Sequence, residues 1–389
     1  MDGAKFAKML SDKHLFELDR MEYKYSVSSV NEFTELLRQN FAQSLPLVDF
    51  SSDELFYLPN LARISTNGMK QLLSAPASNQ SFGLQAMTEE IHATFQIESI
   101  HSSRNSIRHI LNGYAPRNEE ESRIYGMKRG LDFIADRQNT ITEENLHQLY
   151  QISTGDYLPD EDRLLPDHFY RHDVVYVVDG EESREGLPAQ QLPDAMKRLV
   201  DFANAKDGIN ELHKAAILHF AFAYYHPYFD GNGRTARLLH LWYLVQQGYP
   251  AALFTPFSRH IAESKAAYYK AYDRVEKNAL ISGYTDVTPF LSYFCNEVYN
   301  RLQVDAAPPQ ADLQVYQTAL AEGKITEKER LLWEYVLSAY GTEEFTTKQL
   351  EKDFRNAAYA TIRTFVMKFH EMELLVARKT GNRVFYKVK

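Results

Sequence analysis

Apolar residues recur at helical spacing over most of the chain. Residues 1 to about 60 are mixed and predict no definite element. Acidic residues fill the first turn after Asn118, which makes Asn118 a suitable N-cap for the helix that follows it. The pattern predicts helices over residues 62–73, 85–100, 106–111, 119–136, 142–155, 193–204, 211–225, 234–247, 258–277 and 288–302. The expected fold is therefore mainly α.

One segment in the middle of the chain has a different pattern. Residues 173–178 are rich in Val and Tyr, and Asp179-Gly180 follows as a turn. This composition predicts a short β-hairpin over about 171–188. The hairpin serves either as a structural element or as an edge on which an extended peptide pairs, and the sequence leaves both open.

The pattern changes again after a Pro- and Ala-rich break at 304–310. Helices are expected over 326–339, from about 346, and over 357–374, and two strands over 375–378 and 384–388 flank a polar turn. This order resembles a winged helix-turn-helix. The expected domains are an N-terminal helical region (1–110), a core (111–305), a linker (306–325) and a winged-helix module (326–389).

The composition narrows the class of protein. The chain has 389 residues, 44% of them apolar and 24% charged, as in ordinary globular proteins of two or three domains. No run of about 18 uncharged apolar residues occurs, so no membrane span is expected. The N-terminus lacks the apolar run of a signal peptide, and Cys295 stands alone. We therefore expect a cytoplasmic protein without an internal disulfide.

Charge is distributed unevenly along the chain. The whole chain carries a net charge of −9, which argues against general affinity for nucleic acid. Residues 346–389 nevertheless hold ten Lys or Arg against four Asp or Glu. Arg363 would lie on the recognition helix of a winged helix, and Arg378, Lys379 and Arg383 on its wing. DNA is thus a candidate partner of this module; dimer contact, which would give a homodimer, and docking of a target protein stay open.

The stretch from His226 to Arg237 holds the densest chemistry. It reads His-Pro-Tyr-Phe-Asp-Gly-Asn-Gly-Arg-Thr-Ala-Arg and joins two apolar helical segments. Unpaired backbone N–H groups at a helix N-terminus attract anions, and Gly231 and Gly233 allow close approach of the backbone. This inventory suits a site that holds a nucleotide's phosphates and a divalent metal beside a general base.

Each polar side chain of this stretch has a chemical use. Asp230 is a hard oxygen ligand for Mg²⁺ that phosphate oxygens also bind. Arg234 and Arg237 are positive forks for phosphate oxygens. His226 titrates near neutral pH and can accept a proton from a hydroxyl. A Gly-Asn-Gly turn or a histidine at a helix end is common alone, so the argument depends on their joint occurrence.

This stretch closely resembles the signature of the Fic family, His-Pro-Phe-x-(Asp/Glu)-Gly-Asn-Gly-Arg-x-x-Arg. Only Tyr228 departs from it, since the family usually has Phe there. The resemblance implies a helical Fic core and transfer of AMP from ATP to a Ser, Thr or Tyr hydroxyl of a target protein. His226 would be the base and Asp230 the Mg²⁺ ligand. The nucleotide would be bound by the segment Gly231, Asn232, Gly233, Arg234, Thr235, Ala236 and Arg237.

Three further segments resemble parts of that family. Thr94 to Ser99 is similar to the inhibitory motif (Ser/Thr)-x-x-x-Glu-(Gly/Asn), and only Ser99 departs from it. By that resemblance Glu98 would pair with Arg237 and block productive ATP binding. The 171–188 hairpin would be the flap that clamps a target segment. Tyr268 would contact the adenine, although core packing explains it equally well.

The leading hypothesis is thus an autoinhibited protein adenylyltransferase that uses ATP and Mg²⁺. Two alternatives remain. In the first, the enzyme removes AMP from the same target, and Glu98 positions water. In the second, the chain is a DNA-binding regulator that senses nucleotide. The target protein is not readable from the sequence.

Overall fold

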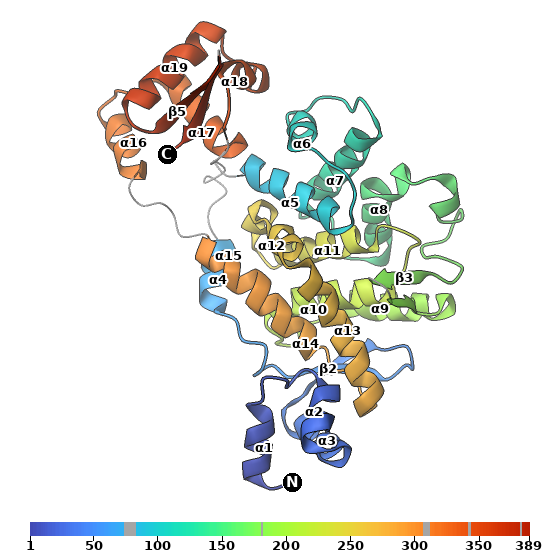
Figure 1. Cartoon of the computed structure of the whole chain (residues 1–389). Helices are drawn as coiled ribbons and strands as arrows, with labels where there is room; N and C mark the ends of the chain where they lie inside the picture. The colour runs from blue at the N-terminus through green and yellow to red at the C-terminus, as the bar shows by residue number, and fades with distance from the viewer. Residues whose placement is uncertain (74–82, 180–181, 306–311, 341–343, 382) are drawn as a thin grey trace.

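The computed structural model of the chain describes residues 1–73, 83–179, 182–305, 312–340, 344–381 and 383–389. Its elements are mainly helical, with three two-stranded antiparallel hairpins. Figure 1 shows the N-terminal helices and the C-terminal module at opposite ends of the molecule, with the helical core between them. Within these ranges no helix is both long and apolar enough to cross a bilayer.

The first 60 residues, for which the sequence predicted nothing definite, form three helices and a hairpin. The helices are short and amphipathic, and Met9, Met21, Val30 and Phe33 make a small core of their own. The hairpin that follows packs on the main core through Leu45, Leu47 and Leu55. The elements are α1 (Gly3–Leu10), α2 (Leu18–Tyr25), α3 (Val27–Phe41), β1 (Gln43–Val48) and β2 (Glu54–Tyr57).

The central core agrees with the predicted helical pattern. Asn118 caps α7 as expected, because its side chain accepts a hydrogen bond from the backbone of Glu121 at 2.9 Å. The helices are α4 (Thr66–Leu73), α5 (Gly83–Ile97), α6 (Arg104–Leu111), α7 (Glu119–Ala135), α8 (Glu143–Ser153), α9 (Leu192–Asn204), α10 (Glu211–Tyr225) and α11 (Asn232–Gln246). Helices α10 and α11 are buried on almost every face and form the centre of the core.

Two predicted helices after α11 differ in detail. The helix expected over 258–277 is two helices, α12 (Phe257–Glu263) and α13 (Lys265–Ser282), with a break at Ser264. The Ser264 side chain donates back to the carbonyl of His260 at 2.6 Å, a bond that competes with a regular helix. The helix expected over 288–302 is α14 (Thr288–Tyr293), a π-helical turn (Phe294–Tyr299) and α15 (Asn300–Asp305).

The C-terminal module has the predicted order of elements and a core of its own. Part of the expected linker is helical, since α16 covers Asp312–Ala321, while residues 306–311 lie outside the described residues. The remaining elements are α17 (Glu327–Ala339), α18 (Thr347–Phe354), α19 (Tyr359–Glu371), β5 (Leu375–Thr380) and β6 (Arg383–Val388). Phe345 pairs with Tyr386 beside the last hairpin. That the module is a winged helix stays a prediction.

Helix α5 connects the two larger cores. It packs along α12 in the central core and against α17 of the C-terminal module. Leu84, near its beginning, packs against the C-terminal core, whereas Ile91, Phe95 and Ile97 belong to the central core. The end of α5 that carries Thr94 and Glu98 is therefore held inside the central core.

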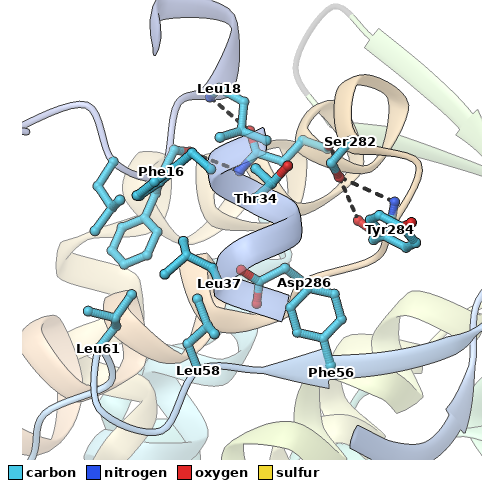
Figure 2. Close-up of a pocket in the computed structure, with 13 residues that line it drawn as sticks. Phe16, Leu18, Thr34, Leu37, Phe56, Leu58, Leu61, Ser282, Tyr284 and Asp286 are labelled. Atoms are coloured by element: carbon cyan, nitrogen blue, oxygen red, sulfur yellow. Dashed lines mark hydrogen bonds between the residues drawn. The ribbon is translucent and has the colours of Figure 1, made fainter. Parts of the chain in front are cut away.

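A small pocket lies where the N-terminal helices meet α13 and the turn before α14. Figure 2 shows its apolar walls, to which Phe16, Leu37 and Phe56 contribute, and the carboxylate of Asp286 beside them. Burial raises the pKa of Asp286 to about 6, against hydrogen bonds from Thr288. None of the site residues predicted from the sequence lines this pocket.

Candidate active site

The predicted motif forms the loop between α10 and α11. His226 follows the last residue of α10 in the left-handed conformation, with φ 55° and ψ 59°. Gly231 precedes α11 in a similar conformation, with φ 79°. Asn232 fastens the loop, because its side-chain amide accepts from the backbone N–H of Tyr228 at 2.9 Å and donates to the Tyr228 carbonyl at 2.8 Å. The loop therefore folds back on itself before the helix begins.

Both glycines of the motif lie where a side chain would not fit. A Cβ at Gly231 would lie 2.3 Å from the side chain of Thr154. A Cβ at Gly233 would lie 2.6 Å from Oε1 of Glu98 and 3.1 Å from Nη1 of Arg237. The first turn of α11 thus leaves its backbone open to a charged group, at the end of a helix that attracts anions.

His226 begins what we call the base side of the loop, residues 226–228. Its Nδ1 lies 3.3 Å from the carbonyl oxygen of Ala223, one turn back in α10. A proton on Nδ1 satisfies this carbonyl and assigns the lone pair to Nε2. The imidazole is half-buried. Its tautomer therefore suits a general base acting through Nε2.

Tyr228, the one departure from the signature, points into the core. Its ring stacks on Tyr150 with centroids 3.6 Å apart, and both rings are fully buried. Burial raises the pKa of Tyr228 well above its usual value. Among the described residues its hydroxyl has no hydrogen-bond partner. The extra oxygen relative to Phe thus gains nothing that the structure shows.

Asp230 lies at the tip of the loop with its side chain 51% exposed. One carboxylate oxygen accepts from the backbone N–H of Gly231 at 2.6 Å, and the other from Nη2 of Arg234 at 2.9 Å. Within the described part of the chain, no three His, Cys, Asp or Glu side chains gather as a metal site. A hard, half-exposed oxygen donor fits Mg²⁺ that takes its other ligands from phosphate and water.

The arginine side of the loop, Arg234 and Arg237, is occupied by Glu98. One Glu98 oxygen accepts from Nε of Arg234 at 2.6 Å, and the other accepts from Nη2 of Arg237. Thr94 adds its hydroxyl as an acceptor for Nε of Arg237 and its carbonyl for Nη2 at 3.3 Å. Both arginines are 3% exposed. The sequence predicted a pair with Arg237 alone, and the structure adds Arg234.

Electrostatics favour the charged form of Arg234. Burial acts to lower the pKa of the Arg234 guanidinium, but the carboxylates of Glu98 and Asp230 outweigh it and raise that pKa. Charged hydrogen bonds of this kind are among the strongest in proteins. An anion that takes the place of Glu98 must therefore offer both arginines equivalent oxygens.

The end of α5 is closed by a Schellman motif. Ser99 is left-handed, with φ 58°, and its N–H donates to the carbonyl of Gln96 at 3.1 Å. The N–H of Ile100 donates to the carbonyl of Phe95 at 2.9 Å. This explains why Gly or Asn suits the position that Ser99 fills, since both adopt left-handed conformations more easily. Glu98 is thus the last residue before a fixed turn.

Three residues expected to bind the nucleotide are packed in the core. Thr235 and Ala236 are fully buried in α11, and the Thr235 hydroxyl donates to the carbonyl of Gly231 at 2.9 Å. Tyr268 is 3% exposed, and its hydroxyl lies 2.8 Å from Nε2 of His219. Burial raises the pKa of Tyr268 to about 12. Contact of these residues with a nucleotide stays a prediction.

The predicted hairpin is present beside the loop. Strands β3 (Tyr176–Asp179) and β4 (Glu182–Glu185) pair antiparallel, while the turn residues 180–181 lie outside the described residues. The segment after β4 is bonded to the end of α10, because the N–H of Leu187 donates to the carbonyl of Tyr225 at 3.2 Å. Its role as a flap for a target segment stays a prediction.

Sequence reasoning gave no role to two residues that hold this site together. Arg171 is 2% exposed and bonds to the carbonyl of His226. Glu90 is buried on α5 and accepts from the backbone N–H of Ser258 at 2.8 Å, which fixes α5 to the start of α12. Glu90, Thr94 and Glu98 are four residues apart, so this spacing on one helix face could have identified Glu90.

Comparisons with known proteins agree with the motif. Residues 140–244 match the Fic/DOC family. A protein adenylyltransferase fic-1 of Caenorhabditis elegans is 30% identical over 102 residues, 26% of this chain and 18% of that protein. A protein adenylyltransferase Fic of Nematostella vectensis is 25% identical over 181 residues, 45% of this chain and 37% of that protein. The chain therefore spans well under half the length of these relatives.

A solved structure extends the likeness beyond the motif. The crystal structure of a Fic family protein from Desulfovibrio desulfuricans G20 aligns with 85% of this chain and 95% of its own, with a TM-score of 0.52. At 18% sequence identity this likeness concerns the fold alone. These findings show that residues 140–244 match the Fic/DOC family and that the chain is distantly similar in sequence to Fic protein adenylyltransferases.

Proposed function

We propose that the protein transfers AMP from ATP to a hydroxyl group of a target protein, and that Glu98 inhibits this transfer. The observation that carries the proposal is the double contact of Glu98 with Arg234 and Arg237. A half-buried carboxylate that binds two buried motif arginines is a stand-in for phosphate oxygens. On this proposal a nucleotide and Glu98 would compete for the same two arginines.

The loop supplies the parts that the nucleotide needs. The backbone of Gly231, Asn232 and Gly233 forms the start of α11. Phosphate oxygens bind best at such a helix N-terminus. Arg234 and Arg237 neutralise phosphate charge. Asp230 would hold Mg²⁺, which neutralises charge on the departing pyrophosphate. Thr235, Ala236 and Tyr268 belong to the proposed nucleotide site on the family resemblance only.

The reaction is a displacement at the α-phosphorus. The target hydroxyl oxygen forms a bond to this phosphorus, and the bond from phosphorus to the oxygen bridging the α- and β-phosphates breaks. The hydroxyl proton goes to Nε2 of His226, and pyrophosphate leaves with the bridging oxygen. Nearly all of the catalytic effect comes from positioning and charge stabilisation, because the chain supplies one weak base.

The remaining parts of the proposal concern partners. The β3–β4 hairpin is the edge on which the target segment would pair. The C-terminal module, residues 326–389, would be a winged helix, and the charged side chains of Arg363, Lys379 and Arg383 are exposed on it. Arg378 pairs with Glu344, which reduces the positive charge of its hairpin. DNA binding is therefore a secondary candidate, measurable as duplex binding that weakens steeply with salt.

The test uses ATP labelled at either the α- or the γ-phosphorus. Purified Glu98→Gly protein with Mg²⁺ should become covalently labelled from the α position only. His226→Ala in the same background should lower that rate about 100-fold or more, as loss of a general base does. Label from the γ position would indicate phosphate transfer. No label from either position, or labelling that survives His226→Ala, would reject the proposal.

A further inference from the structure

Arg171 is a buried cation whose hydrogen bonds, within the described part of the chain, all go to backbone carbonyls. Its Nε donates to the carbonyl of His226 at 2.8 Å and its Nη1 to that of Asp173 at 2.6 Å. Its Nη2 donates to the carbonyl of Leu187, and its own N–H to that of Pro227 at 2.9 Å. One residue thus joins the base side of the motif loop to the segments before β3 and after β4, which lie together at the open end of the hairpin.

Packing alone does not explain why a charged side chain is buried at position 171. Burial lowers the pKa of its guanidinium, and nearby Asp173 opposes this shift. Among the described residues it forms no ion pair, so its desolvation is offset by carbonyl dipoles and by the nearby charge of Asp173. Burying an unpaired charge costs several kcal/mol, and an apolar residue of similar volume is often the more stable choice. What the guanidinium adds is direction, because its planar fork fixes the carbonyls that it binds.

Those carbonyls determine where the base points. His226 is left-handed, a conformation that costs a residue with a side chain about 1–2 kcal/mol. The bond from Arg171 to the His226 carbonyl holds the backbone in this conformation. Gly186, which follows β4, lies close to both Arg171 and His226. A Cβ at Gly186 would be 2.8 Å from Nη2 of Arg171 and 3.3 Å from Cβ of His226.

From this geometry we propose that Arg171 is a positioning residue that keeps the hairpin and the base in register. A target segment paired on β3–β4 then presents its hydroxyl at a fixed distance from Nε2 of His226. This inference rests on the proposed function. It assigns Arg171 to the alignment of the target hydroxyl and separates it from nucleotide binding, which uses Arg234 and Arg237 on the other side of the loop.

The experiment measures the two sides separately in the Glu98→Gly protein. Arg171→Lys keeps the charge and loses the fork. Self-labelling with α-labelled ATP gives the maximal rate, and calorimetric titration with ATP and Mg²⁺ gives the dissociation constant. We expect the maximal rate to fall about 100-fold, the scale of a misplacement of about 1 Å, and the dissociation constant to change less than about twofold. Arg163→Lys is the matched control, because Nε of Arg163 also donates to a carbonyl, that of Leu158 at 2.9 Å.

A second variant covers the case in which Arg171→Lys does not fold. Gly186→Ala keeps Arg171 but places a Cβ 2.8 Å from its Nη2, so the guanidinium and the hairpin end must move apart. It should give the same split between rate and affinity. A rate within about threefold of the parent, or a parallel loss of ATP affinity, in the folded variants would overturn the role of Arg171. If the Glu98→Gly parent itself takes up no label, the proposed function fails and this inference fails with it.

Discussion

The two sides of the motif loop are held in opposite ways. On the base side, a cation from outside the motif binds the backbone carbonyls of His226 and Leu187. On the arginine side, a carboxylate from α5 binds the side chains of Arg234 and Arg237. Backbone carbonyls keep their positions as long as the chain is folded. A carboxylate on two arginines can be replaced by any better anion.

This difference separates what is fixed from what is switched. In the proposed function the base would need one geometry in every state, and its carbonyl contacts use groups that no substrate resembles. The arginines would bind Glu98 and phosphate in turn, and Glu98 resembles phosphate in charge and in its paired oxygens. Inhibition would then follow from holding the end of a helix at the phosphate site.

The largest effect is expected at Asp230, which lies between the two sides. Asp230→Asn keeps the oxygen that binds the Gly231 N–H and removes the charge that Mg²⁺ requires. In the Glu98→Gly background we expect self-labelling to fall about 100-fold or more. Chelation of Mg²⁺ in the parent protein should have a similar effect. An unchanged rate after Asp230→Asn would show that the metal is held elsewhere.

The second prediction tests whether the arginine side is held by Glu98. Glu98→Gly leaves two buried guanidiniums without their shared carboxylate, so the free energy of unfolding without nucleotide should fall by about 2–4 kcal/mol. ATP with Mg²⁺ should restore most of this loss, because it fills the same site. Urea unfolding with and without ATP measures both.

Glu263→Gly, which breaks an exposed pair with Arg259, is the control. It should change stability by less than about 1 kcal/mol beyond the effect of glycine in a helix. If Glu98→Gly is as mild as this control, or if ATP stabilises wild type and variant equally, the Glu98 contact does not compete with nucleotide.

The sequence predicted the contacts of the arginine side better than those of the base side. The spacing of Thr94 and Glu98 placed them on one helix face, and the resemblance to the Fic inhibitory motif implied the pair of Glu98 with Arg237. The bond of Glu98 to Arg234 depends on how α5 enters the core, which the spacing does not determine. Arg171 could not be recognised, because its partners are carbonyls and any residue supplies a carbonyl.

The fold shows the same division. Long apolar helices such as α10 were predicted to the residue, since their pattern is continuous. The first 60 residues were not, because α1 and α2 have eight residues each and too few turns for a clear period. The break at Ser264 was not predicted either, because the apolar pattern continues on both sides of it.

The third prediction concerns Ser99, the residue that follows Glu98 at the end of α5. Ser99 is left-handed, and Ser99→Gly should relieve that conformation and stabilise the end of α5 by about 1 kcal/mol. A firmer helix end holds Glu98 on the arginines more tightly, so self-labelling of the otherwise wild-type chain should fall severalfold. A rise in stability together with a rise in labelling would show that the end of α5 does not control the contact. The same substitution in the Glu98→Gly background should leave labelling unchanged.

The smallest effect is expected on the fixed side, at Tyr228. Its hydroxyl is buried and has no partner among the described residues, and Tyr150 covers its ring. Because an unsatisfied buried hydroxyl is costly, Tyr228→Phe should leave the free energy of unfolding equal or raise it by about 1 kcal/mol. The self-labelling rate of the Glu98→Gly protein should change less than about twofold, since the base keeps its anchor at Arg171. A large loss of rate with full stability would mean that the hydroxyl acts on the base, and the base side would then be tuned by its core as well as fastened by its carbonyls.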